Sequence, residues 1–280
     1  MNVRIVVDST ADVTDEIRAK LSVVPLTVHF GEQEYVDGIT INHKQFYEML
    51  VETDVLPTTS QPSPEAFAQV FRQAQEAGEQ VVALTVSSKL SGTCQSAMIA
   101  AADFPDSVWV VDTKTVAIGC GILAELAVRL KEEGLSAEEI VARLEEEREN
   151  IRVIALLDTL EYLKKGGRIS KTVAFAGGLL SIKPVVTIQD GEIHILGKAR
   201  GSKQGNNLLV TEIQKAGGVD FTKPLMLGYT GLSDALLEKY VLDSGALWDG
   251  HGDCIQSTPI CSVIGTHAGP GAIAVAFFKQ

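Results

Sequence analysis

The chain has 280 residues, of which 45% are hydrophobic and 21% charged. This is the composition of a globular protein with one large or two modest domains, and it excludes wholesale disorder. A net charge of −12 argues against nucleic acid and anionic membrane as general partners. No apolar run reaches the roughly 20 residues of a membrane helix, and the first residues do not resemble a signal peptide. We therefore expect a cytoplasmic protein without stable membrane insertion. The sequence gives no oligomeric state, and a monomer is the preferred interpretation.

The first 150 residues alternate predicted strands with predicted helices. The strands are β-branched runs, and the helices begin at residues that cap helices well. In chain order the expected elements are a strand at 3–8, a helix from the Ser9–Asp12 cap to about 21, a strand at 24–30, a helix at 45–51, a loop at 58–64, a helix from 63–65, a strand at 80–86, a helix at 91–102, a strand at 108–112, and helices at 115–133 and 136–150. This order predicts a parallel sheet covered on both faces.

The remainder follows a different plan. Asp190-Gly191 between two apolar runs is a strong hairpin signal, and Gly166-Gly167 is a helix stop. The expected elements are a strand at 152–157, a short helix at 158–165, hairpin strands at 184–189 and 192–197, a helix at 204–215, a strand at 225–230, a helix at 234–245 and a strand at 254–260. We predict an α/β protein with two domains, 1–150 with a parallel sheet and a smaller α+β unit at 151–280.

Charge is distributed unevenly between these two parts. Residues 1–150 hold 11 Lys and Arg against 25 Asp and Glu, whereas residues 151–280 hold 13 against 11. Basic residues crowd into the start of the second part, at Arg152, Lys164, Lys165, Arg168, Lys171, Lys183, Lys198, Arg200 and Lys203. The pattern indicates a local site for a small anion or a docking face. For Lys164, Lys165 and Lys171 a solvated surface is the preferred interpretation.

Two hydroxyl-rich loops are candidates for binding an anion. Ser91, Gly92 and Thr93 lie between a predicted strand and a predicted helix, where open parallel sheets bind ligands. Free N–H groups of the first helical turn and the two hydroxyls suit an anion, and Gly92 allows a ligand to approach the backbone. A simple helix cap at Ser91 is an equally acceptable interpretation. Thr59 and Ser60, in a loop stiffened by two prolines, are weaker candidates for the same sheet edge, and the loop is otherwise an ordinary turn.

Basic residues beside glycines extend this candidate site. Arg168 follows the glycine pair, and arginine suits bidentate recognition of a carboxylate or phosphate. Arg200 repeats this chemistry after the hairpin, and His267 stands in a Gly/Pro-rich turn with Gly269. A structural role for the lone His267 stays open. The histidine spacing and the four distant cysteines give no metal or disulfide pattern, and we expect no metal and no catalytic residue.

Motifs along nearly the whole chain resemble those of the DegV family of bacterial fatty-acid-binding proteins. They occur in the family's order and several are many residues long. They are Asp8-Ser9-Thr10-Ala11-Asp12, Val24-Pro25-Leu26, Tyr35-x-Asp37-Gly38, Thr59-Ser60-Gln61-Pro62-Ser63, Leu90-Ser91-Gly92-Thr93 with Ser96-Ala97, Tyr162-Leu163-x-Lys165-Gly166-Gly167-Arg168-Ile169, Ile182-Lys183-Pro184, Arg200-Gly201 and His267-x-Gly269-Pro270-Gly271.

The resemblance implies a long-chain fatty acid buried between two domains, with no other cofactor. It implies that the carboxylate lies near Thr59, Ser91, the Gly92 and Thr93 N–H groups, Arg168 and His267. It also implies a non-catalytic carrier role: a separate kinase subunit uses ATP and Mg²⁺ to convert the bound acid to an acyl phosphate. Apolar residues at 173–176 and 179–180 are candidates for the tunnel wall, or plain core.

A second function from a different class stays open. The same hydroxyls and histidine suit an enzyme acting on a small phosphorylated or carboxylated metabolite, with His267 as general base or phosphoryl acceptor. A weaker third interpretation is a regulator that docks a partner through its acidic face.

Overall fold

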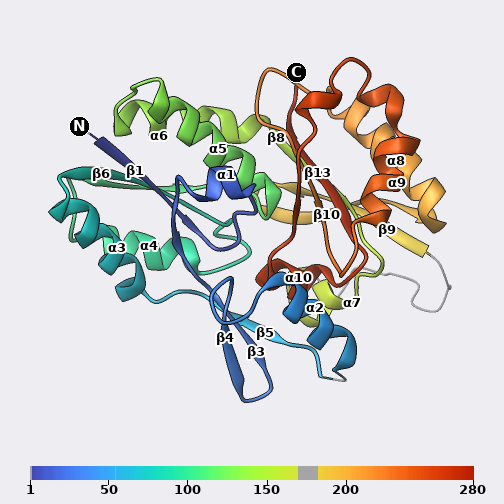
Figure 1. Ribbon diagram of the computed structural model, residues 1–280, viewed down its shortest axis with the longest axis horizontal. Helices are drawn as coiled ribbons and strands as arrows, with labels where there is room; N and C mark the ends of the chain where they lie inside the picture. The colour runs from blue at the N-terminus through green and yellow to red at the C-terminus, as the bar shows by residue number, and fades with distance from the viewer. Residues whose placement is uncertain (1, 54, 170–181) are drawn as a thin grey trace.

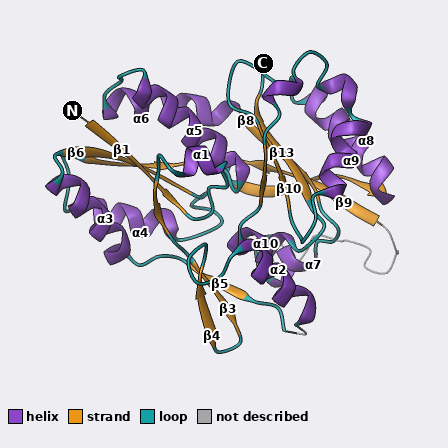
Figure 2. Cartoon of the chain, in the orientation of Figure 1, coloured by secondary structure: helices purple, strands orange, loops and turns teal. Residues whose placement is uncertain are grey.

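The computed structural model describes residues 2–53, 55–169 and 182–280, which form three β-sheets with helices around them (Figures 1 and 2). Two sheets are large and stand side by side, and the third is a small sheet below them in the view of Figure 1. The predicted α/β class, with a parallel N-terminal sheet and a further sheet in the second part of the chain, is confirmed.

The first sheet has four parallel strands in the order β2-β1-β6-β7. Its strands are buried on both faces because their side chains alternate between two helical layers. Val6 faces Phe67 and Phe71 of α3, whereas Ile5 and Val7 belong to the core that contains α5. The bounds are β1 Asn2–Asp8, β2 Ser22–Val24, β6 Glu79–Thr85, β7 Val108–Asp112, α3 Pro64–Glu76, α4 Thr93–Ala101, α5 Ile118–Glu132 and α6 Ala137–Glu147.

The second sheet has six strands in the order β10-β9-β8-β13-β11-β12 and is antiparallel except for the β11–β12 pair. Helices α8 and α9 cover one face, where Leu209 and Tyr240 pack against Val275 and Phe277. The bounds are β8 Ile151–Leu156, β9 Ile182–Gln189, β10 Glu192–Arg200, β11 Met226–Tyr229, β12 Ser257–Pro259, β13 Ile273–Phe278, α8 Gly201–Lys215 and α9 Ala235–Asp243.

One hydrophobic core joins the two large sheets through α5. The helix is buried along nearly its whole length, and its residues pack both with Ile5 of β1 and with Ala276 and Phe278 of β13. The first strand of the six-stranded sheet begins at Ile151, so that sheet lies wholly within the second predicted domain. The two predicted units therefore share an apolar interface, in which α5 occupies the middle.

The third sheet and three short helices, α2, α7 and α10, lie across one end of the two large sheets, whereas α1 lies beside α5 (Figure 1). Val28 of the small sheet packs with Phe46 and Tyr47 of α2 and with Val263 of α10. This sheet, α10 and β13 were not predicted from the sequence. The bounds are β3 Thr27–Phe30, β4 Gln33–Val36, β5 Thr58–Ser60, α1 Asp15–Arg18, α2 His43–Glu52, α7 Glu161–Lys165 and α10 Ser262–Ala268, with 3-10 turns at Arg148–Asn150, Gly245–Leu247 and Gly252–Cys254.

Several local predictions are confirmed at the level of hydrogen bonds. Ser63 caps α3 with Pro64 in the first turn. Ser136 and Glu139 form the predicted capping box at α6. Asp190 and Gly191 both have positive φ, 51° and 81°, as a tight two-residue hairpin turn requires.

Other predictions are wrong at their boundaries, and for identifiable reasons. The strand predicted at 24–30 is split into β2 and β3, because Pro25 has no N–H and the N–H of Leu26 bonds the Ser9 hydroxyl instead of a strand. The loop predicted at 58–64 contains β5, which pairs with β3. Helix α1 begins after Thr14 rather than at 9–12. His267 lies in the last turn of α10 rather than in an open turn.

Candidate functional site

A largely apolar cavity lies against the face of the six-stranded sheet opposite α8. It has a volume of about 120 Å³, counted as the space open to the centres of water-sized molecules, and about 10–15 Å³ on that measure holds one water. Residues from both parts of the chain line it: Thr10, Leu26, Thr59, Val86, Leu90, Ser91, Val116, Ala117, Val153, Ala155, Leu157, Leu163, Arg168, Val186, Thr187, Ile188, Ile193, Gly228, Thr230, Ile260, Val263, Ile264, His267, Ala268, Ala272, Ile273 and Ala274.

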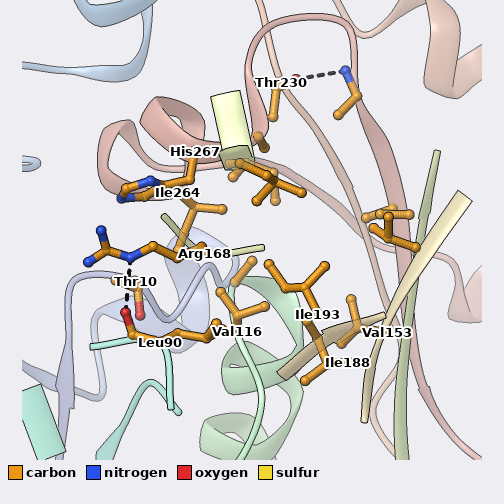
Figure 3. A pocket seen from close by; sticks show the side chains of 18 of the residues that line it. Thr10, Leu90, Val116, Val153, Arg168, Ile188, Ile193, Thr230, Ile264 and His267 are labelled. Carbon is orange, nitrogen blue, oxygen red and sulfur yellow. Dashed lines mark hydrogen bonds between the residues drawn. The ribbon is translucent and has the colours of Figure 1, made fainter. Parts of the chain in front are cut away.

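The cavity has a polar end and an apolar end. Figure 3 shows Arg168 and His267 together at one end, whereas Val153, Ile188 and Ile193 lie at the other. Among the lining residues predicted from the sequence are Thr59, Ser91, Arg168 and His267. They come from β5, the loop before α4, the segment after α7, and α10. Elements far apart in the sequence therefore bring these side chains to one cavity.

His267 is held next to Thr59. The Nε2 atom of His267 lies 3.0 Å from the Thr59 Oγ1 atom. Burial, with a smaller contribution from the positive charge of Arg168, lowers the pKa of His267 to about 4, so the imidazole is neutral at pH 7. In the tautomer with the proton on Nε2, His267 donates to Thr59, which leaves the Thr59 hydroxyl proton available to a ligand.

Close packing fixes the imidazole from its other side. The Nδ1 atom of His267 is buried without a hydrogen-bond partner among the described residues. A Cβ atom built on Gly166 would lie 2.3 Å from Nδ1, so only glycine at 166 leaves room for the ring. Gly166, predicted as part of a helix stop, therefore also allows His267 to pack against the end of α7.

Arg168 supplies the positive charge at this end. Its Nε atom donates to the Leu90 carbonyl at 3.1 Å, and its Nη1 atom donates to the Gly166 carbonyl at 2.6 Å. No carboxylate of the described residues forms an ion pair with it. Burial lowers the pKa of the guanidinium, which nonetheless stays protonated at neutral pH. Among the described residues the partners of this half-buried cation are neutral carbonyls, so its charge attracts an anionic ligand.

Only one residue of the Ser91–Thr93 segment faces the cavity. Ser91 lines it, and its Oγ atom lies 2.9 Å from the Thr93 hydroxyl, which is buried. Gly92, rather than Ser91, is the residue before the first turn of α4. Gln61 fills the space beside the Gly92 Cα, and its Nε2 donates to the Gly92 carbonyl at 3.2 Å. A Cβ atom built on Gly92 would lie 2.1 Å from Gln61 Oε1. The glycine thus admits Gln61, not a ligand.

Three further residues predicted from the sequence lie away from the cavity lining. Ser60 faces the other side of β5, where its hydroxyl is 2.8 Å from His29 Nε2. Arg200 is exposed at the junction of β10 and α8. Gly269 ends α10 with φ 73°, and a Cβ there would lie 2.3 Å from the Tyr162 ring, so this glycine allows α10 to pack on α7.

Buried carboxylates, which sequence reasoning took for helix caps or overlooked, position the polar end. Asp8 Oδ1 accepts hydrogen bonds from the Thr10 N–H and hydroxyl at 2.9 and 2.6 Å, and Oδ2 accepts one from the Val86 N–H at 2.7 Å. Burial raises the pKa of Asp8 despite these bonds. Asp8 thus joins the ends of β1 and β6 and presents Thr10 to the cavity.

Two more carboxylates hold the start of the helix that carries His267. Asp12 Oδ1 accepts from the Cys261 N–H at 2.8 Å, and Asp37 Oδ1 accepts from the Ser262 N–H at 3.2 Å. Burial raises the pKa of both carboxyl groups, and the negative charge of Asp37 raises the pKa of Asp8 and of Asp12 further. The available signal in the sequence was an aspartate at the end of a buried strand, at Asp8.

Within 2–53, 55–169 and 182–280, no group of three or more His, Cys, Asp or Glu side chains is arranged to hold a metal ion. None of the helices in these ranges is long and apolar enough to cross a membrane. The apolar segments at 173–176 and 179–180, predicted as tunnel wall or core, and Lys171 lie outside the described residues.

Comparisons with known proteins agree on one family. The model of a family described as "Uncharacterised protein, DegV family" matches residues 2–280. A DegV domain-containing protein of Caldanaerobacter subterraneus subsp. tengcongensis is 36% identical over 99% of both chains. The solved structure titled "Fatty Acid Binding of a DegV family Protein from Thermus thermophilus" is 34% identical over the whole of both chains, with a TM-score of 0.89. A stearic acid-binding protein from Eubacterium ventriosum is 30% identical over 100% of this chain and 98% of its own, with a TM-score of 0.87.

Proposed function

The chain belongs to the DegV family, and on this premise we propose that it binds one long-chain fatty acid. The carboxylate is held at the polar end of the cavity by Thr59, Ser91 and Arg168, with His267 orienting the Thr59 hydroxyl, and the acyl chain fills the apolar part. The observation that carries this proposal is the division of one cavity into a cationic, hydroxyl-bearing end and an apolar remainder.

Physical chemistry supports a fatty acid as the ligand. A carboxylate that leaves water needs charged or hydrogen-bonding partners, and the polar end offers one guanidinium and two hydroxyls. Each methylene that moves from water into the apolar part contributes roughly 0.8 kcal/mol. A small, fully polar metabolite would instead leave most of this lining without a suitable contact.

The relatives support the same class of ligand. The Thermus thermophilus structure is titled for fatty acid binding, and the Eubacterium ventriosum protein is described as binding stearic acid. Both match this chain over its full length with more than a quarter of their residues identical.

We further propose that the protein is a cytoplasmic carrier rather than the catalyst. The resemblance noted in the sequence implies a separate kinase, to which the bound carboxylate is presented. There a carboxylate oxygen attacks the γ-phosphorus of ATP, the bond to the ADP oxygen breaks, and an acyl phosphate forms. Neutral His267 suits this role, because it donates a hydrogen bond to Thr59 without adding a second positive charge beside Arg168.

Two measurements test the binding function. Lipid is extracted from the purified, denatured protein and identified by mass spectrometry, and the delipidated protein is titrated with palmitate and oleate. We expect a long-chain acid in the extract or micromolar or tighter binding of the added acids; absence of both would refute the binding function.

The carrier role is tested on the loaded protein. Palmitate-loaded protein is incubated with ATP and Mg²⁺, and acyl phosphate is trapped with hydroxylamine. We expect no product from this chain alone. Product formation that is abolished by His267→Ala, or a phosphohistidine, would favour the alternative in which this chain is an enzyme.

A further inference from the structure

A second hollow lies behind the apolar end of the cavity, on the α8 side of the six-stranded sheet. Its volume is about 450 Å³ on the measure used above. Apolar side chains, among them Ile154 and Leu196, line part of it, and charged side chains of α8, β8 and the segment around Arg148 line the rest. Thr187 and Ile188 line both hollows, so β9 is the wall between them.

This wall is thin because β8 and β9 are not paired along their whole length. Strands β8 and β9 pair from Leu156–Val185 to Ile154–Thr187, and the paired register ends at that point although both strands continue. The Thr187 hydroxyl donates to the Val153 carbonyl at 2.8 Å, which is a side-chain bond in place of the next ladder bond. Beyond this bond the backbones of β8 and β9 are no longer paired, so side chains fill the space between the two strands.

Ile188 is the side chain in position to fill this space between β8 and β9. It lies two residues after Val186 on β9, on the same face, and it pairs across the hairpin with Ile193. All three line the cavity. Figure 3 shows Ile188, Ile193 and Val153 at the end far from Arg168 and His267, so an acyl chain anchored at the polar end extends toward Ile188.

We propose that Ile188 sets the longest acyl chain that the cavity accepts, by forming the floor between the cavity and the second hollow. The inference rests on the proposed fatty-acid-binding function and adds its chain-length limit. Truncating Ile188 connects the two hollows and lets the methyl end of a longer chain lie against Ile154 and Leu196, which line the second hollow.

The test is the affinity of delipidated protein for myristate, palmitate, stearate and arachidate. Ile188→Ala removes about three carbons, so we expect the longest well-bound acid to gain about two carbons. Affinity for acids beyond the wild-type limit should rise about fourfold for each methylene newly buried. Ile188→Phe adds volume at the apolar end of the cavity and should make the longest well-bound acid shorter. The matched control is Ile195→Ala, on the same face of β10 but outside the cavity lining, and it should leave the profile unchanged.

The outcomes separate this inference from the function on which it rests. If the wild type binds none of the acids, the proposed function fails and the chain-length limit with it. If the wild type binds them and both Ile188 variants keep the wild-type profile, the function stands and the inference is overturned. Should Ile188→Ala fail to fold, Ile188→Val and Ile188→Phe still give opposite expected shifts.

Discussion

The Nε atom of Arg168 donates a 3.1 Å hydrogen bond to the carbonyl oxygen of Leu90, 78 residues earlier in the chain. Leu90 precedes α4 in the first part, and Arg168 follows α7 in the second. The bond fixes the direction of the guanidinium at the polar end of the cavity. The two parts of the chain thus each contribute to one anion-binding arrangement.

Arg168→Ala should weaken palmitate binding by about 10- to 100-fold, because a hydrogen bond to a charged group contributes about 1.5–3 kcal/mol. Isothermal titration of delipidated protein measures the loss. Arg168→Lys keeps the positive charge but lacks the planar guanidinium, so its affinity for palmitate should lie between those of wild type and Arg168→Ala. If Arg168→Ala instead lowers the melting temperature sharply while each folded molecule binds palmitate normally, Arg168 is structural.

Ser91→Ala should have a smaller effect, a loss of about two- to tenfold in palmitate affinity, as expected for one neutral hydrogen-bonding group. Ser60→Ala is the matched control, because Ser60 bonds His29 on the other side of β5. The same titration measures both. Equal losses in the two variants would contradict the assignment of Ser91 to the ligand.

His267 should make the protein less stable as the pH falls from about 6.5 toward 4. Its pKa is lowered to about 4 in the folded state, so between these values the unfolded chain takes up a proton that the folded protein does not. Above pH 6.5 neither state binds the proton and the effect vanishes. Denaturant unfolding should show wild type losing roughly 1–3 kcal/mol more than His267→Gln between pH 7 and 4.5.

Comparison with His267→Gln removes the contribution of the buried carboxyl groups, which both proteins share. Burial raises the pKa of Asp8, Asp12 and Asp37, so their effect has the opposite direction: it favours the folded state as the pH falls. NMR titration of the His267 ring gives an independent value. An ordinary histidine pKa near 6.5 would show that the ring is not desolvated.

Asp8→Ala should destabilise the protein by about 2–4 kcal/mol, because it leaves buried N–H groups of Thr10 and Val86 without their acceptor. Denaturant unfolding measures the change. Asp103→Ala, at an exposed carboxylate, should change stability by less than about 0.5 kcal/mol. A small effect at Asp8 would mean that the loops after β1 and β6 are held together by packing instead.

Regular elements could be predicted where local chemistry decides them. The β-branched strands of the first sheet, the Ser136–Glu139 capping box and the Asp190-Gly191 turn all depend on neighbouring residues. The third sheet depends on partners far apart in the sequence, since β5 pairs with β3 about thirty residues earlier. Short strands of this kind carry little periodicity, which explains why they were not predicted.

The site could be predicted in part, because residue chemistry indicates an anion but not which side chain faces it. Arg168 and His267 line the cavity, whereas Ser60 does not, because alternate residues of a strand point to opposite sides. Gly92 and Gly269 are glycines for packing reasons that involve Gln61 and Tyr162. Such contacts between distant side chains are not readable from spacing.

The most direct test of the central claim compares palmitate with hexadecanol, which has the same chain length but no charge. Both are titrated into delipidated wild type and Arg168→Ala under identical conditions. We expect wild type to bind palmitate at least tenfold more tightly than hexadecanol, and the variant to lose most of that difference. Equal affinity of wild type for the two molecules would show that no anion-binding end governs this cavity.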